Sequence, residues 1–211
     1  MHTIQTADDI AAAVSALARA EPRFGAIAAS TGLPAIRRRT GGLGGLLRIV
    51  IDQQISLAAG ASIWKRLEAC LAPFEGNRLL AASEEELRAC GLSGAKVRTL
   101  GAIAAATADG SLDFQRLEAL PDDEAHAMLT AVHGIGPWTA DIYLLTCLGR
   151  TDVWPVGDLA LQAAAASAFE LAIRPTAAQL KQMGEPWRPW RAVAARLLWA
   201  HYRHMNGLPA A

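Results

Sequence analysis

Segment 152–158 of the chain ends in a carboxylate, that of Asp158, which stands at the start of an alanine-rich helical pattern. An aspartate in that position caps a helix, because its side chain accepts hydrogen bonds from the N–H groups of the first turn. The same bonds fix the direction of a negative charge, as an electrostatic or general-base role requires. The segment therefore predicts a structural cap or a catalytic carboxylate, and the two roles are compatible.

A second stretch that could bind a ligand is the sequence His-Gly-Ile-Gly-Pro at 133–137, between two helical patterns. Its glycines let the backbone approach another surface closely, and the following helix begins with N–H groups that attract a phosphate. By itself, such a stretch also fits an αα-hairpin whose glycines only relieve crowding. The candidate phosphate-binding residues are His133, Gly134, Ile135 and Gly136.

The elements around these stretches are predicted to be helices. Apolar residues recur at helical spacing, and alternating β-branched patterns are hard to find. A proline and three carboxylates at 121–124 favour the start of the helix that leads into the glycine stretch. A capping box is formed by Ser83 and Glu86. Helices are predicted over 8–18, 84–90, 94–108 and 159–169, and the fold class is all-α.

The composition limits the class of protein. The chain has 211 residues, 52% of them hydrophobic and 19% charged, which predicts a compact core and excludes disorder and coiled coil. No apolar stretch approaches the roughly 20 residues of a membrane span, and the first residues lack the pattern of an export signal. We therefore expect no membrane partner and a cytoplasmic location. Cys70, Cys90 and Cys147 fit neither a disulfide framework nor a zinc site, and are expected to be reduced, buried thiols.

The net charge is zero, but basic residues gather at 31–66 and 181–211. The run Arg37, Arg38 and Arg39 is either solvated surface or a set of contacts to backbone phosphates. The roles of two further pairs of residues are also open. Lys96 and Arg98 either contact phosphate or face water, whereas His201 and His204 fit a solvated helix end better than a metal site.

Several motifs together resemble one family. The sequence at 129–140, followed by Pro-Val-Gly-Asp at 155–158, resembles the helix-hairpin-helix, Gly/Pro-Asp superfamily of DNA base-excision glycosylases. Its 3-methyladenine DNA glycosylase II branch, in a short form, is the most similar. The resemblance extends upstream to Asp-Gln-Gln-Ile-Ser at 52–56 and downstream to Arg-Pro-Trp-Arg at 188–191.

The resemblance implies a two-lobed helical fold with a cleft between the lobes. The terminal lobe is expected to comprise residues 1–42 and 158–211. The central lobe, 43–157, is expected to contain the helix-hairpin-helix at 122–148.

The implied activity is that of a monofunctional glycosylase, which hydrolyses the N-glycosidic bond of alkylated purines, 3-methyladenine among them, in base excision repair. The damaged base is flipped out of the duplex, and Asp158 stabilises an oxocarbenium-like transition state. Trp138 stands where the lyase branch has its Schiff-base lysine, so no lyase activity is expected. The alternatives are a catalytically inactive DNA-binding module, a glycosylase for another damaged base, and a helical protein-interaction domain.

The resemblance also assigns the base pocket to Trp138 and Trp199, whose indoles attract an electron-poor purine. A tryptophan at helical spacing is more often part of a core, so packing is the competing role. Ile142 and Leu159 stand where the bacterial prototype of the branch has tyrosines. The resemblance therefore does not imply that this chain accepts the same range of damaged bases as the prototype.

Gln54, with Gln53 beside it, matches the wedge that fills the space of the flipped base. From the residues alone, Gln54 continues the apolar stripe of a helix that contains Val50. Alternatively, that helix ends near Gln53 and Ser56 caps the next one. The resemblance favours the wedge.

Some relatives bind a monovalent cation through main-chain oxygens of the hairpin, and the ion bridges to a DNA phosphate. Here these oxygens would belong to Thr130, Val132 and Ile135, with Na⁺ or K⁺ as the ion and no cofactor required. The expected partner is double-stranded DNA that contains alkylated bases. The protein is expected to be a monomer associated with the nucleoid.

Overall fold

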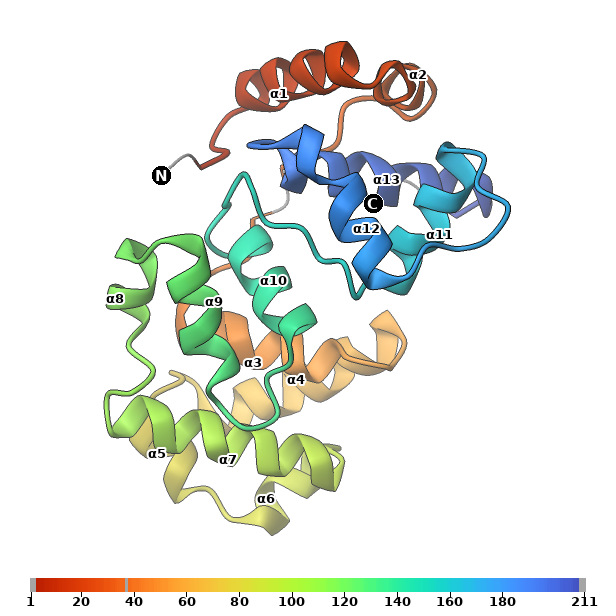
Figure 1. Ribbon diagram of the computed structural model, residues 1–211. Helices are drawn as coiled ribbons and strands as arrows, with labels where there is room; N and C mark the ends of the chain where they lie inside the picture. Colours follow the sequence, from red (N-terminus) through yellow and green to blue (C-terminus); the bar gives the residue numbers. More distant parts are fainter. Residues whose placement is uncertain (1–2, 37, 209–211) are drawn as a thin grey trace. The chain divides into compact units, whose positions relative to one another are not determined.

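The structure is a computed structural model that describes residues 3–36 and 38–208 (Figure 1). These residues form α-helices, one 3-10 helix and loops, and their only strand-like pairing is an isolated bridge between Thr3 and Arg150. The predicted all-α class is confirmed. Two compact units are distinguished: a central unit, Arg39–Leu148, and a terminal unit, Met1–Arg38 with Gly149–Ala211. The lobes predicted from the sequence divide instead at 42/43 and 157/158.

The central unit is built around helix α3, because α3 is apolar on most of its surface. Leu46, Leu47 and Val50 are completely or almost completely buried. Helix α3 contacts α4, α7, α8 and α10. The helices of the unit are α3 (Gly42–Asp52), α4 (Leu57–Leu71), α5 (Gly76–Ala81), α6 (Glu84–Ala89), α7 (Gly94–Ala108), α8 (Phe114–Ala119), α9 (Asp122–Thr130) and α10 (Pro137–Thr146).

Local capping signals set several helix boundaries. Ser83 and Glu86 form the predicted capping box of α6, and Gly91, with φ of 94°, follows the end of that helix. Ser93 caps α7 by accepting a hydrogen bond from the N–H of Lys96. The helices predicted over 84–90 and 94–108 are confirmed, with bounds that differ by one residue at most.

The terminal unit is built around α13, which contacts α1, α2 and α11. Val193, Ala194, Leu197 and Leu198 of α13 are fully buried, so this helix forms the centre of the core of the unit. The helices of the unit are α1 (Ala7–Ala20), α2 (Pro22–Thr31), α11 (Leu159–Ala168), α12 (Ala177–Met183), the 3-10 helix η1 (Glu185–Trp187) and α13 (Arg191–Met205).

An aromatic cluster anchors the loop that leads to α11. Trp187 stacks on Phe169 with ring centroids 5.4 Å apart and meets Phe24 and Trp154 edge to face. The indole N–H of Trp154 donates to the carbonyl oxygen of Leu180 at 2.8 Å. Segment 152–158 is therefore held to the core at Trp154.

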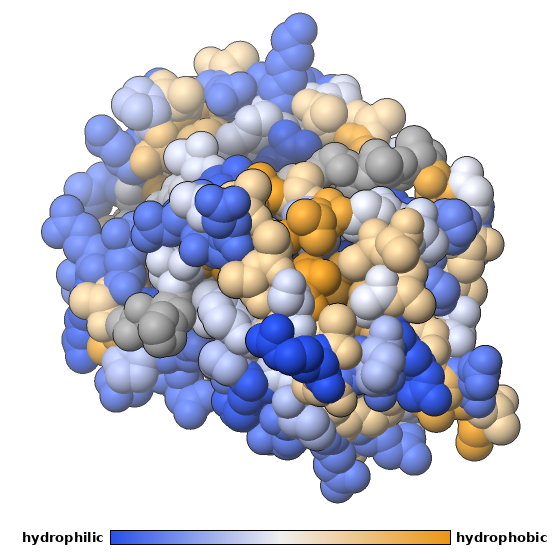
Figure 2. All heavy atoms as spheres, turned by 90° about the horizontal axis from the view of Figure 1, so that it is seen from above, coloured by the Kyte–Doolittle hydropathy of each residue, from blue (hydrophilic) through white to orange (hydrophobic). Residues whose placement is uncertain are grey.

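The surface is mixed in character. Figure 2 shows mainly hydrophilic residues on the face that it presents, with a small hydrophobic patch near the middle. The most exposed large hydrophobic residues include Leu57, Leu159 and Ile173. None of the helices in the described part of the chain has the length and apolar character needed to span a bilayer.

Candidate active site

Asp158 is the N-cap of α11, as its position in the sequence predicts. Its Oδ1 accepts a hydrogen bond from the backbone N–H of Leu161 at 2.8 Å. The approach to the cap is fixed by two further bonds: the N–H of Asp158 donates to the carbonyl of Pro155 at 2.9 Å, and the Gln162 amide donates to the carbonyl of Val156 at 2.8 Å. Asp158 as a residue is half-buried. It is thus a directed negative charge that keeps some access to solvent.

Trp199 contacts the same carboxylate. Its indole Nε1–H donates to Oδ1 of Asp158 at 3.1 Å, across 41 positions of the sequence. Two N–H donors thus converge on one oxygen and fix the orientation of the carboxylate. The structure brings these two predicted site residues together within the terminal unit. Leu159, directly after Asp158, is 62% exposed, so a large apolar side chain stands in solvent beside the carboxylate.

An ion-pair cluster positions the start of segment 152–158. Asp152 pairs with Arg188 and with Arg191, whose Nε lies 2.7 Å from Oδ1. Arg191 also donates to the main-chain carbonyl of Asp152 at 2.8 Å, and it pairs with Glu185 at 3.2 Å. A hydrogen bond from Arg188 lowers the pKa of the Glu185 carboxyl. Sequence reasoning noted both arginines as part of a motif but assigned them no role, because their partner lies more than thirty positions away.

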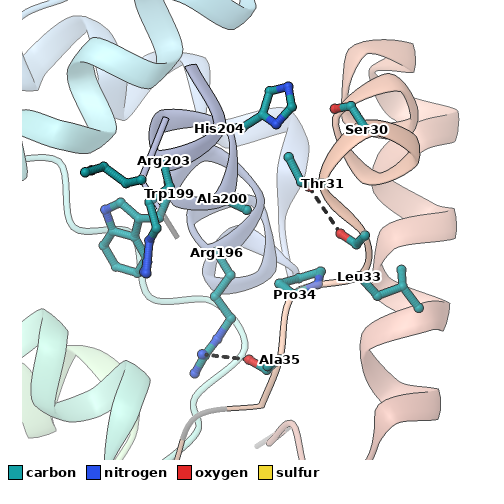
Figure 3. Close-up of a pocket in the computed structure, with 12 residues that line it drawn as sticks. Ser30, Thr31, Leu33, Pro34, Ala35, Arg196, Trp199, Ala200, Arg203 and His204 are labelled. Atoms are coloured by element: carbon teal, nitrogen blue, oxygen red, sulfur yellow. Dashed lines mark hydrogen bonds between the residues drawn. The ribbon is translucent and has the colours of Figure 1, made fainter. Parts of the chain in front are cut away.

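One cavity of about 450 Å³ lies in the terminal unit, and Trp199 is part of its wall. It is formed by the last residues of α2, the segment that follows α2, and the C-terminal part of α13 (Figure 3). Arg196, Arg203 and His204 give the wall a basic character, and Arg196 donates to the carbonyl of Ala35 at 3.4 Å. Burial lowers the pKa of the Arg196 guanidinium. The cavity was missed by sequence reasoning, which assigned nothing to residues 30–35.

The predicted helix-hairpin-helix is present in the central unit as α9, a hairpin and α10. Gly134 has φ of 87°, and a Cβ atom there would overlap the side chain of Thr99. The side chain of Ile135 is buried, whereas His133 and Gly136 are exposed. Gly136 is the N-cap of α10 and supplies no side-chain cap. The hairpin therefore presents backbone at the start of a helix, a feature shared with anion-binding helix N-termini.

The main-chain oxygens predicted to hold a cation, those of Thr130, Val132 and Ile135, belong to the end of α9 and to the hairpin that follows it. Val132 accepts the N–H of Ile135 at 3.0 Å, which leaves one lone pair of that oxygen for a ligand. Thr130 is the last residue of α9, where carbonyl groups lack a partner within the helix. Side-chain clusters of three or more His, Cys, Asp or Glu that suit a metal are absent from the described residues.

The turn that carries Gln54 differs from one of the two predictions. Helix α3 ends at Asp52, Gln53 is its C-cap, and Ser56 caps α4 by accepting the N–H of Ala59 at 3.2 Å. The prediction that one helix continues through Gln54 is therefore wrong. The alternative, a helix that ends near Gln53 with Ser56 as the cap of the next helix, is confirmed. Gln54 is exposed and has φ of 57°, an unusual conformation for a residue other than glycine.

Two contacts hold this turn in place. The Lys96 ammonium donates to the carbonyls of Ile51 at 2.6 Å and of Gln53 at 2.9 Å, and burial lowers the pKa of this lysine. The side chain of Gln53 donates to Oγ1 of Thr139 at 2.6 Å. Lys96 therefore supports the end of α3, a role that sequence reasoning did not assign to it. The tied amide also makes Gln53 less suited than Gln54 to act as a wedge.

The remaining candidates have varied surroundings. Trp138 is half-buried in the first turn of α10, in the central unit, whereas Asp158 belongs to the terminal unit. Arg39 is exposed and pairs with Asp52 at 3.1 Å, and Arg37 lies outside the described residues. The expectation of a buried thiol is wrong for Cys70, which is exposed.

Comparison with known proteins gives a consistent result. The family model of HhH-GPD superfamily base excision DNA repair proteins matches residues 47–189. DNA-3-methyladenine glycosylase 1 of Schizosaccharomyces pombe is 32% identical over 162 residues, which are 73% of this chain and 69% of that protein.

Two solved structures are similar over nearly their whole length. The 3-methyladenine DNA glycosylase of S. pombe, in complex with abasic DNA, has a TM-score of 0.79 and 27% identity, with 89% of this chain and 94% of that chain covered. A DNA-3-methyladenine glycosidase from Bacillus halodurans has a TM-score of 0.83 and 26% identity, with 98% and 94% covered. The chain belongs to the HhH-GPD superfamily of base excision DNA repair proteins.

Proposed function

We propose that the protein is a monofunctional DNA glycosylase, which hydrolyses the N-glycosidic bond of alkylated purines, 3-methyladenine among them, in double-stranded DNA. The observation that carries this proposal is the carboxylate of Asp158, held by Leu161 and Trp199 beside the exposed Leu159. The similarity to proteins named 3-methyladenine DNA glycosylases supports the substrate class.

Asp158 would act on the sugar rather than on the base. When the bond between C1′ and the purine nitrogen breaks, the base leaves with the electron pair and positive charge develops on the deoxyribose. A directed carboxylate stabilises this charge while water adds to C1′ and releases a proton, which leaves an abasic site. An alkylated cationic purine departs as a neutral molecule, so it needs little help from a general acid.

The base must leave the helix before this reaction, at a cost of a few kcal/mol that is lower for a weakened pair. Gln54 is our proposed wedge, because it is exposed on a turn held by Lys96 and can hydrogen-bond to the orphaned base. Trp199 and Trp138 are the proposed stacking residues, with a contribution of roughly 1–3 kcal/mol per stacked base. Leu159 and Ile142, in place of tyrosines, would shape which base is accepted.

The hairpin would hold the DNA backbone. The backbone groups of residues 133–136 would bind a phosphate, and the main-chain oxygens of Thr130, Val132 and Ile135 would hold Na⁺ or K⁺. The ion would supply positive charge at the backbone and takes no part in bond cleavage. We further propose a monomer that works on nucleoid DNA without another cofactor.

The proposal is tested by incubating the protein with a duplex that contains 3-methyladenine, then measuring free base by chromatography and strand breaks on a gel. We expect release of the free base, with breaks that need alkali, because Trp138 replaces the lysine that forms a Schiff base. Tight binding of the duplex without release of the free base would identify an inactive DNA-binding module. Breaks without alkali would contradict the monofunctional assignment, and absence of duplex binding would favour a protein-interaction domain.

A further inference from the structure

Two cysteines that lie 20 positions apart in the sequence meet in the central unit. Cys70 is in the last turn of α4, and Cys90 is the C-cap of α6. Their Sγ atoms lie 3.8 Å apart. A disulfide has a sulfur separation of about 2.05 Å, so the two sulfur atoms would have to come roughly 1.7 Å closer to form one.

The two thiols differ in their access to solvent. Cys70 is exposed, whereas Cys90 is only 3% exposed. Both contribute to the wall of a cavity of about 340 Å³, together with Arg66 and Glu86. Burial, and then the contact with Cys70, raise the pKa of the Cys90 thiol. Cys70, the exposed residue of the pair, is thus the one that a reagent in solution reaches first.

The backbone around Cys90 is held firmly. Arg66 Nε donates to the carbonyl oxygen of Cys90 at 2.9 Å, and the N–H of Cys90 donates to the carbonyl of Glu86 at 3.2 Å. Gly91, which follows, has φ of 94° and lies close to the Arg66 guanidinium. Cys90 therefore stays next to α4, and the pair does not depend on a chance approach of two mobile loops.

We propose that Cys70 and Cys90 form a modification site, at which a small-molecule disulfide such as glutathione disulfide converts the two thiols to an intramolecular disulfide. The Cys70 thiolate attacks the reagent, forms a mixed disulfide and releases one thiolate of the reagent. Cys90 then loses its proton to solvent and attacks the Cys70 sulfur, which releases the second thiolate. Two protein thiols are oxidised and one reagent disulfide is reduced to two thiols.

The product would join α4 covalently to the end of α6. Helix α4 begins directly after the Gln54 turn, and α7, which follows Cys90, supplies Lys96 to the same turn. The modification would thus tie the C-terminal end of α4, the helix that follows this turn, to the loop that leads from α6 into α7. The site itself is independent of the proposed function, because neither cysteine contacts Asp158 or the hairpin in the described hydrogen bonds.

The test is an incubation of the full chain with glutathione disulfide, followed by intact mass measurement and non-reducing peptide mapping. We expect a loss of two hydrogens and a peptide in which Cys70 is linked to Cys90, both reversed by dithiothreitol. The Cys147→Ser variant is the matched control and should form the same link. The Cys90→Ser variant should stop at a glutathione adduct on Cys70, and Cys70→Ser should show neither product.

The melting temperature of the native chain is a second readout, which does not depend on whether a cysteine variant folds. The oxidised native chain should melt at a higher temperature than the reduced one, because the link restricts the unfolded chain. A stable glutathione adduct on Cys70 of the native chain, without the linked peptide, would overturn the proposal. So would a disulfide between two copies of the chain through Cys70 as the main product.

Discussion

At the scale of the residue, one atom, Oδ1 of Asp158, combines a structural and a proposed chemical role. It accepts the N–H of Leu161 as a helix cap and the indole N–H of Trp199. The first bond is a local consequence of the sequence and was predicted. The second joins residues 41 positions apart, so no local pattern contains it.

A prediction at this scale concerns Trp199→Phe. The phenyl ring can still stack on a base but cannot donate to Asp158, and a hydrogen bond to a charged group is worth about 1.5–3 kcal/mol. The single-turnover rate of base release should therefore fall by roughly 10- to 100-fold. Trp190→Phe, in the same unit, is the control and should change the rate little. Equal rates for the native chain and Trp199→Phe would show that the indole N–H is not used.

At the scale of the element, the helix boundaries that carry a cap were predictable and the supports between elements were not. Ser83, Ser93 and Asp158 each leave a pattern within four residues of the boundary that they set. In contrast, Lys96 reaches the end of α3 over 45 positions. Such contacts depend on how helices pack, and one sequence does not reveal which of several lysines makes them.

The Lys96→Met variant tests the support of the Gln54 turn. The variant keeps a long side chain but loses two donated hydrogen bonds, so the turn should become less ordered. We expect base release to fall by roughly tenfold for a lesion in a fully paired duplex, and much less for the same lesion in single-stranded DNA, where no wedge is needed. Arg98→Met on the same helix is the control. An equal loss on both substrates would indicate a general defect and contradict the positioning role.

The ion-pair cluster at the start of α13 leads to a prediction about stability. Arg191 is mostly buried and pairs with Asp152 and Glu185, so Arg191→Met would leave a carboxylate with fewer partners in a half-buried place. The free energy of unfolding, from urea denaturation, should fall by about 3 kcal/mol. Arg23→Met, at an exposed pair with Glu21, should change it by less than about 1 kcal/mol. Similar values for the two variants would contradict the structural role of Arg191.

At the scale of the whole molecule, an all-α fold and membership of a repair superfamily followed from independent motifs spread over much of the chain. The cavity beside Trp199 and the Cys70–Cys90 pair did not, because both are made by segments far apart in sequence. Zero net charge is equally uninformative about partners, because binding to DNA depends on where the charges lie.

Duplex binding gives the prediction at this scale. If the hairpin and a few basic residues contact phosphates, affinity should fall about tenfold or more between roughly 50 and 200 mM salt, through release of counterions. Fluorescence anisotropy with an undamaged duplex measures this. His133→Lys should strengthen binding at neutral pH, since it adds a positive charge at an exposed position of the hairpin. Affinity that does not change with salt would contradict recognition of the DNA backbone.

The most direct measurement is the single-turnover rate of base release by Asp158→Asn on an alkylated duplex. Asparagine caps a helix about as well as aspartate, so the melting temperature should stay close to that of the native chain. Removal of the negative charge should nevertheless slow base release on the order of 100-fold or more, with duplex binding retained. Release at the native rate by a folded, DNA-binding Asp158→Asn variant would contradict the central role of this carboxylate.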